Sequence, residues 1–174
     1  MAKRHERTHA RRCALQVLYT SEIQGAYPSV VASSERFLSE DGDLPDYAQK
    51  LIQGVEAHQI EIDRMLTSTS ENWALARMPI VDRSILRLAV FEIFNCDDVP
   101  VSVSINEAVE LAKGFGGEDD SPRFVNGVLG RIARSMEGDG TGAVGVAGAD
   151  AAAAGPVDAL VGASGAAACV QVGV

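Results

Sequence analysis

The sequence predicts an all-α protein of six or seven helices joined by short loops. Nearly every periodic stretch repeats its apolar residues at spacings of three and four, which is the spacing of one helical face. No long stretch alternates apolar and polar residues between turn signals, as a half-buried strand would. The last 38 residues contain 12 Ala and 9 Gly, with no aromatic or basic residue. We therefore predict a helical domain over residues 1–136 and an acidic, disordered tail over 137–174.

The first predicted helix carries its apolar stripe over residues 10–21 and ends at Gly25. The stripe repeats at three and four residues, as a helix packed against a core on one side requires. We assign Arg7 and Arg11 to other faces of this helix.

Three shorter helices are predicted to follow. Proline favours the first turn of a helix, so a second helix is expected from Pro28 to Leu38 and a third from Pro45. A separate fourth helix is predicted over residues 60–66, before the break at Ser-Thr-Ser 68–70.

The helix after Pro79 is predicted to be central, because apolar side chains nearly cover its circumference and must be surrounded. It has only four charged positions, Asp82, Arg83, Arg87 and Glu92. For these we expect structural ion pairs.

Two more helices complete the domain. Ser104 is a candidate N-cap of a helix that ends at Gly114. A glycine-rich acidic loop then leads to Ser121 as cap and Pro122 as first helical residue. The apolar stripe of the last helix is predicted to bury Phe124, Val125, Val128, Leu129, Ile132 and Met136.

Charge is distributed unevenly along the chain. The net charge is -9, yet the first 13 residues contain five basic residues and one acidic residue. A molecule polarised in this way can attract a polyanion at one end and a basic partner elsewhere.

The cysteines and the hydropathy indicate a cytoplasmic protein. Cys13, Cys96 and Cys169 have no spacing that suggests disulfides or a metal clip, which favours a reducing compartment. No apolar stretch reaches the roughly 18 residues of a membrane span, and the first residues lack the apolar core of a signal peptide.

The stretch HERTH, from His5 to His9, matches the H-E-x-x-H pattern of zinc proteases. His5, His9 and Cys13 could share one helical face. However, a catalytic zinc needs three ligands in a closed cavity, and the only other histidine, His58, lies in the middle of a helix without further ligands nearby. The surrounding arginines would also repel a dication. We therefore predict no metal site.

The basic start allows two interpretations, a solvated helix end or a phosphate-binding surface. Arg7 and Arg11 are four residues apart, so they could contact successive phosphates. The Gly-Phe-Gly-Gly loop lacks the strand and the Lys-Ser/Thr of a P-loop. Its Phe115 could stack on an unpaired base, whereas core packing is the favoured interpretation for Phe124. No nucleophile, base and orienting group cluster in the sequence, so an enzymatic activity is not predicted.

Three segments resemble the NusB family: ARRCALQVLY (10–19), VDRSILRLAVFEI (81–93) and DVPVSVSINEAVELAKGFGGEDDSPRFVNGVLGRIAR (98–134). The resemblance covers about residues 3–136. It implies two orthogonally packed helical subdomains and a role in transcription antitermination without enzymatic activity or a cofactor. Such a protein binds the boxA element of nascent ribosomal RNA transcripts together with NusE, a small ribosomal protein, and their complex joins RNA polymerase.

The resemblance also implies the residues of the site. The RNA contacts correspond to Lys3, Arg4, Arg7, Arg11 and Arg12 at the start, and to Lys113, Phe115, Arg123 and Phe124 around the last loop. An acidic residue that modulates RNA affinity corresponds to Asp119, with Asp120 as the alternative because the loop has one extra residue. Tyr19 and Asp82 match positions that contact NusE.

Two alternatives remain open at this point. The same helical domain resembles the N-terminal domain of some ribosomal RNA cytosine methyltransferases, although the chain is too short for their catalytic domain. The chain could also be a homodimer whose basic end is masked by the second copy.

Overall fold

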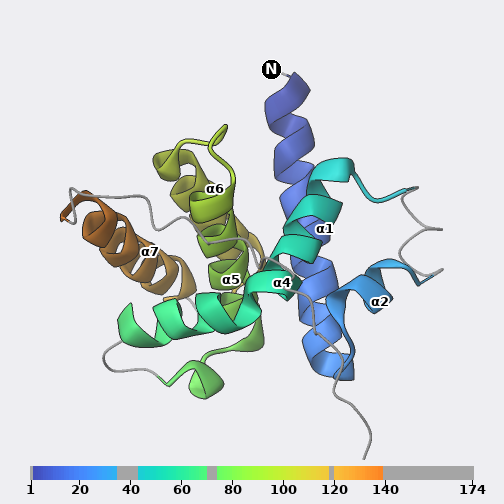
Figure 1. The fold of residues 1–174 in the computed structure, drawn as a ribbon, viewed down its shortest axis with the longest axis horizontal. Coiled ribbons are helices and arrows are strands. Elements are labelled where there is room, and N and C mark those ends of the chain that lie inside the picture. The colour runs from blue at the N-terminus through green and yellow to red at the C-terminus, as the bar shows by residue number, and fades with distance from the viewer. Residues whose placement is uncertain (1, 35–42, 70–73, 118–119, 139–174) are drawn as a thin grey trace, which may run out of the picture. The chain divides into compact units, whose positions relative to one another are not determined.

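Helices make up all the regular structure in the described part of the chain, as the sequence predicts. The computed structural model describes residues 2–34, 43–69, 74–117 and 120–138, and of these the side chains at 2–4, 137 and 138 are not described. The elements in this part are α1 (Ala2–Gln24), α2 (Pro28–Ala32), α4 (Asp46–Thr69), a short 3-10 helix (Leu75–Arg77), α5 (Ile80–Asn95), α6 (Val101–Phe115) and α7 (Ser121–Gly138) (Figure 1).

The helices pack as two sets that meet at α4 and α5. The first set contains α1, α2 and α4, which contact one another, and the second contains α5, α6 and α7. Helix α5 also packs against both α1 and α4. In Figure 1, α1 and α2 lie on the right and α6 and α7 on the left, and α4 crosses from the right, in front of α1, to the lower left. This arrangement agrees with the two helical subdomains that the family resemblance implies.

Helix α5 is the centre of the core. Every residue from Ser84 to Ile93 is buried, as expected for a helix whose circumference is almost entirely apolar. Phe94, which the sequence pattern places among the inward residues, is instead 40% exposed at the end of this helix. The polar residues Arg83, Arg87 and Glu92 form ion pairs with other helices, which confirms their predicted structural role.

Helix α4 corrects the prediction of two separate helices in this region, because it is continuous over Asp46–Thr69. No proline interrupts this stretch, and its glycine, Gly54, lies where α4 meets α5. A Cβ at position 54 would lie 1.9 Å from Cζ of Phe91. Glycine is therefore required for the close approach of the two helices. The Ser-Thr-Ser stretch does coincide with the end of α4.

Helix ends agree with the predictions in part. Helix α1 ends just before Gly25, as expected. Ser104 does not cap α6, because this helix begins at Val101 and Ser104 is buried within it. Pro100 is the residue before the helix, since its fixed φ suits the start of α6 better than its interior. Met136 is 40% exposed and not buried, because the last turns of α7 extend past the core.

Two predicted segments lie in part outside the described residues. Helix α2 ends at Ala32 with Ser33 as its C-cap, so it is shorter than the helix predicted to Leu38, and residues 35–38 of that prediction are outside. The tail predicted over 137–174 stays a prediction, since residues 139–174 are also outside. None of the described helices has both the length and the apolar character that crossing a membrane requires.

Candidate functional site

Helix α1 has two faces of different character. With 3.6 residues per turn, steps of three and four residues follow one face. The exposed face carries His5, His9, Arg12, Gln16, Tyr19 and Ile23. The buried face carries Arg11, Ala14, Leu15 and Leu18. The two arginines at positions 11 and 12 are therefore neighbours in sequence but lie in different environments.

Arg11 lies in a buried network of charged and polar groups. Its side chain is 3% exposed, its Nε donates to Oε1 of Glu92 at 2.9 Å, and its Nη1 lies 3.3 Å from Oε2 of Glu107. The hydroxyl of Thr8 donates to Glu107 at 2.9 Å, and the hydroxyl of Tyr47 donates to Glu92. We call these five residues the Arg11 cluster. Burial raises the pKa of the Tyr47 hydroxyl, and its hydrogen bond to Glu92 raises it further, so it stays a donor at neutral pH.

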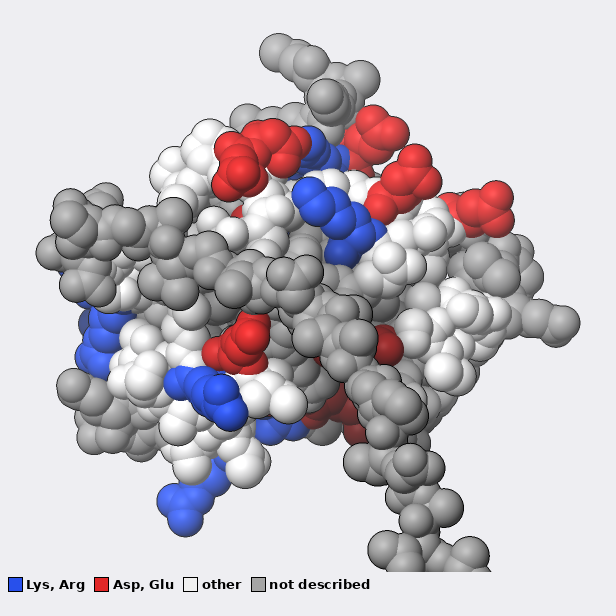
Figure 2. Space-filling model, viewed as in Figure 1, with Lys and Arg blue, Asp and Glu red and all other residues white. Residues whose placement is uncertain are grey.

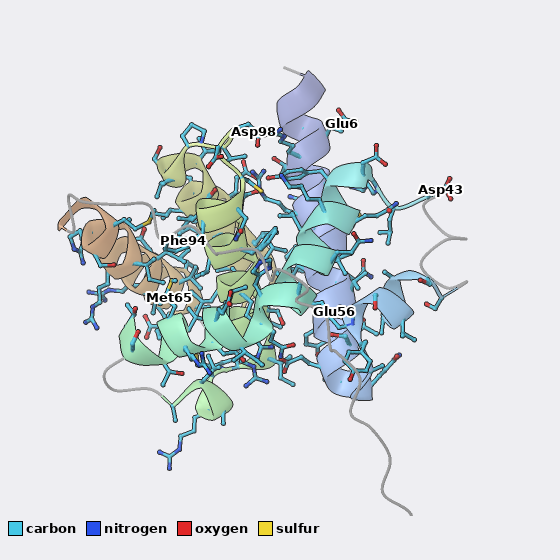
Figure 3. All side chains as sticks on the ribbon, in the orientation of Figure 1. Glu6, Asp43, Glu56, Met65, Phe94 and Asp98 are labelled. Atoms are coloured by element: carbon cyan, nitrogen blue, oxygen red, sulfur yellow. The ribbon has the colours of Figure 1, made fainter. Side chains whose placement is uncertain are left out.

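Arg7 lies one turn earlier, at the edge of this network. Its guanidinium forms an ion pair with Asp98, in the loop between α5 and α6, and stacks over the Tyr47 ring at 4.7 Å from the ring centre. Figure 3 labels Asp98 beside the N-terminal part of α1. The hydrogen bond with Asp98 raises the pKa of Arg7 and lowers the pKa of the Asp98 carboxyl. The pair therefore stays charged over the physiological range.

These contacts correct the expected role of Arg11 in phosphate binding. Arg11 cannot reach an external phosphate in this arrangement, because its guanidinium is buried between two carboxylates. The spacing of Arg11 in the sequence indicates its burial, although the cluster of basic residues around it suggests a surface position. Arg11 is three residues before Ala14 and seven before Leu18, which places it on the buried stripe and not on another face. Arg7 is also engaged by a carboxylate, but at the surface.

The exposed face of α1 borders a groove of about 520 Å³. Its lining comes from three elements, and the residues are His9, Arg12, Cys13, Leu15, Gln16, Tyr19, Val81 and Phe115. Phe115, at the end of α6, is 50% exposed. The structure thus brings together Arg12, Tyr19 and Phe115, three residues that the sequence singled out separately. It adds His9, Gln16 and Val81, of which the first two could have been found from their spacing with Arg12 and Tyr19.

The end of α6 and the start of α7 hold Phe115 in place beside α1. Gly116 follows Phe115, and a Cβ at this position would lie 2.4 Å from the Ala112 carbonyl oxygen and 2.7 Å from Cβ of Ser121. Only glycine allows the chain to pass this closely between the two helices. Among the described glycines of this loop, Gly116 thus has a packing role.

The other predicted RNA contacts have different surroundings. Lys113 is exposed and pairs with Glu110 at 2.7 Å, and Arg123 is exposed on α7. Phe124 is partly buried and packs against the core, which agrees with the favoured interpretation of this residue. Asp119 and the side chains of Lys3 and Arg4 lie outside the described residues.

Of the two predicted NusE contacts, Tyr19 is exposed and Asp82 is not. Tyr19 is 40% exposed and lines the groove. Asp82 is 3% exposed, and its Oδ2 accepts a hydrogen bond from the hydroxyl of Ser121 at 3.0 Å. The Asp82 carboxylate is therefore turned to the interior in this structure, and its contact with NusE stays a prediction. Its carboxylate holds the start of α7 against α5, and its neighbour Val81 reaches the groove instead.

The HERTH stretch lies within α1, with both of its histidines on the exposed face. Within the described residues, no group of three or more His, Cys, Asp or Glu side chains could hold a metal ion. His5 and His9 are both exposed, and Nε2 of His9 lies 3.5 Å from Sγ of Cys13. His58 lies on α4, where its Nδ1 is 2.9 Å from the carbonyl oxygen of Gly54.

The charge near the start of α1 is mixed and not uniformly positive. Figure 2 shows acidic side chains on both sides of the basic ones at the top of the view, over the N-terminal half of α1 and the start of α4. The start of the chain was predicted to be mainly basic, and within the described residues two of its arginines, Arg7 and Arg11, are paired with carboxylates of the protein itself.

The fold and the groove define an all-helical binding protein. The NusB family model matches residues 8–134. The chain is similar to the transcription antitermination protein NusB of Saccharopolyspora erythraea, with 49% identity over 131 residues that cover 73% of this chain and 86% of that protein. The corresponding protein of a Nocardioides species is 45% identical over 130 residues, with coverages of 74% and 94%. The chain belongs to the NusB family.

Solved structures support the same assignment. NusB of T. maritima matches with a TM-score of 0.67 and 34% identity over 74% of this chain and 90% of that chain. A structure of the antitermination factors NusB and NusE in complex with dsRNA matches with a TM-score of 0.66 and 27% identity, over 75% and 98%. The NusB-like fold is thereby confirmed. The family carries a transcription function and not an enzymatic one, so the methyltransferase-related alternative is not favoured.

Proposed function

We propose that this chain is a transcription antitermination factor that binds boxA RNA of nascent ribosomal RNA transcripts together with NusE, and that the complex acts on elongating RNA polymerase. The observation that carries the proposal is the groove along the exposed face of α1, where Arg12 and the aromatic side chains of Tyr19 and Phe115 meet. The similarity to a NusB chain solved with NusE and dsRNA supports both partners.

The groove suits an unpaired stretch of RNA. A guanidinium can bind a backbone phosphate, and an aromatic ring at the edge can stack on a base, a combination typical of proteins that bind single-stranded nucleic acid. Arg12 is exposed on α1 and Phe115 is half exposed across the groove. Two further cationic side chains are exposed in this part of the chain, Lys113 on the last turn of α6, where it pairs with Glu110, and Arg123 on the first turn of α7.

The same surface supports a place for NusE next to the RNA. Tyr19 lines the groove, Ile23 continues the exposed face of α1 beyond it, and both side chains are exposed. Aromatic residues of this kind are frequent in protein interfaces, since one end is apolar and the hydroxyl can form a hydrogen bond. Tyr19 would then contribute to the contact with NusE without the help of the buried Asp82.

The proposal is tested by titrating labelled boxA RNA with the protein, with and without NusE, at two salt concentrations. We expect tighter binding in the presence of NusE. Arg12→Ala should weaken binding and reduce the slope of log affinity against log salt by about 0.7, the value for one phosphate contact on a single strand. Arg77→Ala is the matched control, because Arg77 is also exposed but lies in the 3-10 helix away from the groove.

Two results would count against the proposal. One is boxA binding no tighter than that of a scrambled RNA with NusE present. The other is an equal loss of affinity in Arg12→Ala and Arg77→Ala, since a general effect of charge would then suffice.

A second copy of the chain is the competing occupant of this surface. Tyr19, Ile23 and Phe115 are exposed apolar groups that a homodimer could cover, and such a dimer would hide the RNA surface. Light scattering at the concentrations used for RNA titration measures this directly. We expect the RNA-bound form to contain one copy of the chain, and addition of RNA to dissociate any dimer.

A further inference from the structure

We propose that Asp98 competes with RNA for Arg7, so that this one carboxylate sets how much the basic start of α1 contributes to RNA binding. The inference rests on the proposed function, since it names a residue that tunes the same RNA surface. It differs from a role of Asp119 in the last loop, because Asp98 lies between α5 and α6 and its contact is with α1.

The position of the ion pair allows exchange of one anion for another. The Arg7 side chain is 22% exposed and that of Asp98 is 58% exposed. Both line a surface pocket of about 350 Å³ between α1 and the start of α6. A phosphate arriving from solvent can therefore reach the guanidinium without displacing any part of the core.

The contact with Tyr47 keeps the guanidinium in place during such an exchange. Its centre lies 4.7 Å from the middle of the Tyr47 ring, within the range of a cation–π interaction. Loss of Asp98 would thus leave the guanidinium held at the surface by the ring face. A phosphate would meet a donor that is already oriented, and binding would not have to order a flexible side chain.

Arg11 cannot take part in the same exchange, although it lies one turn along the helix. Its two partners, Glu92 and Glu107, are buried, and both would be left as unpaired charges in the interior if the guanidinium moved outward. When Arg7 releases Asp98, by contrast, the carboxylate is solvated by water. Arg7 is therefore the arginine of this pair that can be released to bind RNA.

The expected change in RNA affinity can be estimated from the free energy that an exposed ion pair contributes. Such pairs contribute little because water and salt screen them, so the competition should reduce RNA affinity by about two- to fivefold. Freeing Arg7 adds one phosphate contact, which increases the salt slope by about 0.7 for a single strand. The change in the slope of log affinity against log salt is more diagnostic than the change in affinity, because the slope depends on the number of phosphate contacts.

The test compares Asp98→Asn with Asp97→Asn, each in the natural background and in Arg7→Gln. Asp97 is the adjacent exposed acid, so its substitution changes the net charge by the same amount at nearly the same place. Thermal melts first establish that all variants are folded, and Arg7→Met, which also removes the charge, replaces Arg7→Gln if the latter is not. The probes are boxA RNA with NusE and poly(U) alone, each at several salt concentrations.

We expect Asp98→Asn to bind both RNAs more tightly and with the steeper slope, and we expect this gain over Asp97→Asn to disappear in Arg7→Gln. Equal effects of the two asparagine variants, or a gain that persists without Arg7, would overturn the inference. The proposed function can fail separately. In that case the protein would not prefer boxA RNA, while Asp98→Asn would still strengthen poly(U) binding through Arg7.

Discussion

The two faces of α1 show how the same residue type acquires opposite roles within one helix. Arg11, on the buried face, is enclosed by two carboxylates, whereas Arg12, on the next residue, is exposed and lines the groove. The difference comes from helical register alone, because successive residues are about 100° apart around the axis. A cluster of arginines at a helix start is therefore not one binding surface but two sets of side chains with separate tasks.

Two charged residues of opposite sign on α1, Arg11 and Glu22, form ion pairs with α5. Arg11 pairs with Glu92 near the end of α5, and Glu22 pairs with Arg83 and Arg87 near its start. These pairs match only if α1 and α5 run antiparallel. A reversed or shifted packing of α1 would bring charges of the same sign together in a buried site, which is strongly unfavourable. The charged residues thus select one arrangement of two apolar helices.

The largest expected difference between the two faces of α1 is the loss of stability in Arg11→Ala compared with Arg12→Ala. Removal of the guanidinium leaves Glu92 and Glu107 buried without their counter-ion, a change that typically costs about 3–5 kcal/mol. Urea denaturation gives the change in the free energy of unfolding. Arg12→Ala is the control, and it should change stability by less than about 0.5 kcal/mol, as exposed substitutions usually do.

Equal stability of the two variants would contradict the assignment of Arg11 to the interior. A large loss of RNA affinity in Arg11→Ala without loss of stability would restore it as a direct RNA contact.

The next largest effect concerns the exposed face. Phe115→Ala should weaken the binding of boxA RNA by about 1–3 kcal/mol, the range found for one base stacked on an aromatic side chain. Stability should change little, because the ring is half exposed. Phe94→Ala is a matched control, since Phe94 is also partly exposed but lies at the far end of α5, beside α7 (Figure 3). A similar loss of affinity in both variants would remove the stacking role of Phe115.

Most helices could be predicted from the sequence because their spacing, start and end signals are local. The apolar period, Pro28, Pro79 and the glycine after α1 are all visible without knowing the fold. It failed where the local signal was ambiguous. Residues 46–69 contain polar stretches that suggested two helices, whereas α4 is continuous over Asp46–Thr69. The close approach of Gly54 to Phe91 explains the glycine within α4, and this contact between distant residues is not visible in the sequence.

The site was harder to predict because the sequence position of a polar residue does not show which distant residue it will pair with. Arg11 and Asp82 are both buried, and their partners Glu92 and Ser121 are 81 and 39 residues away in sequence. No spacing rule connects residues so distant. By contrast, Arg12, Tyr19 and Phe115, which the sequence singled out as site candidates, are exposed, and what the sequence did not provide was that they border one groove.

The smallest expected change in stability concerns Glu22, whose contribution to the free energy of unfolding should depend on pH. Burial alone would raise the pKa of Glu22, but the hydrogen bonds and charges of Arg83 and Arg87 outweigh it, so the pKa lies below its ordinary value of 4.5. A carboxyl of lowered pKa adds stability above its unfolded pKa, and this is lost as the pH falls through the folded value. Glu22→Gln should therefore cost about 1 kcal/mol at pH 7, since a charged hydrogen bond becomes a neutral one.

The difference in stability between the two proteins should begin to shrink as the pH falls below 4.5, and it should vanish once the pH is below the lowered pKa of folded Glu22, where this carboxyl is neutral in the natural chain as well. Urea denaturation from pH 7 to pH 3 measures this difference directly, and effects of all other carboxylates cancel between the two proteins. A difference that stays constant over this range would show that Glu22 stabilises α1 by packing and not by its charge. The antiparallel match of α1 and α5 would then depend on Arg11 and Glu92 alone.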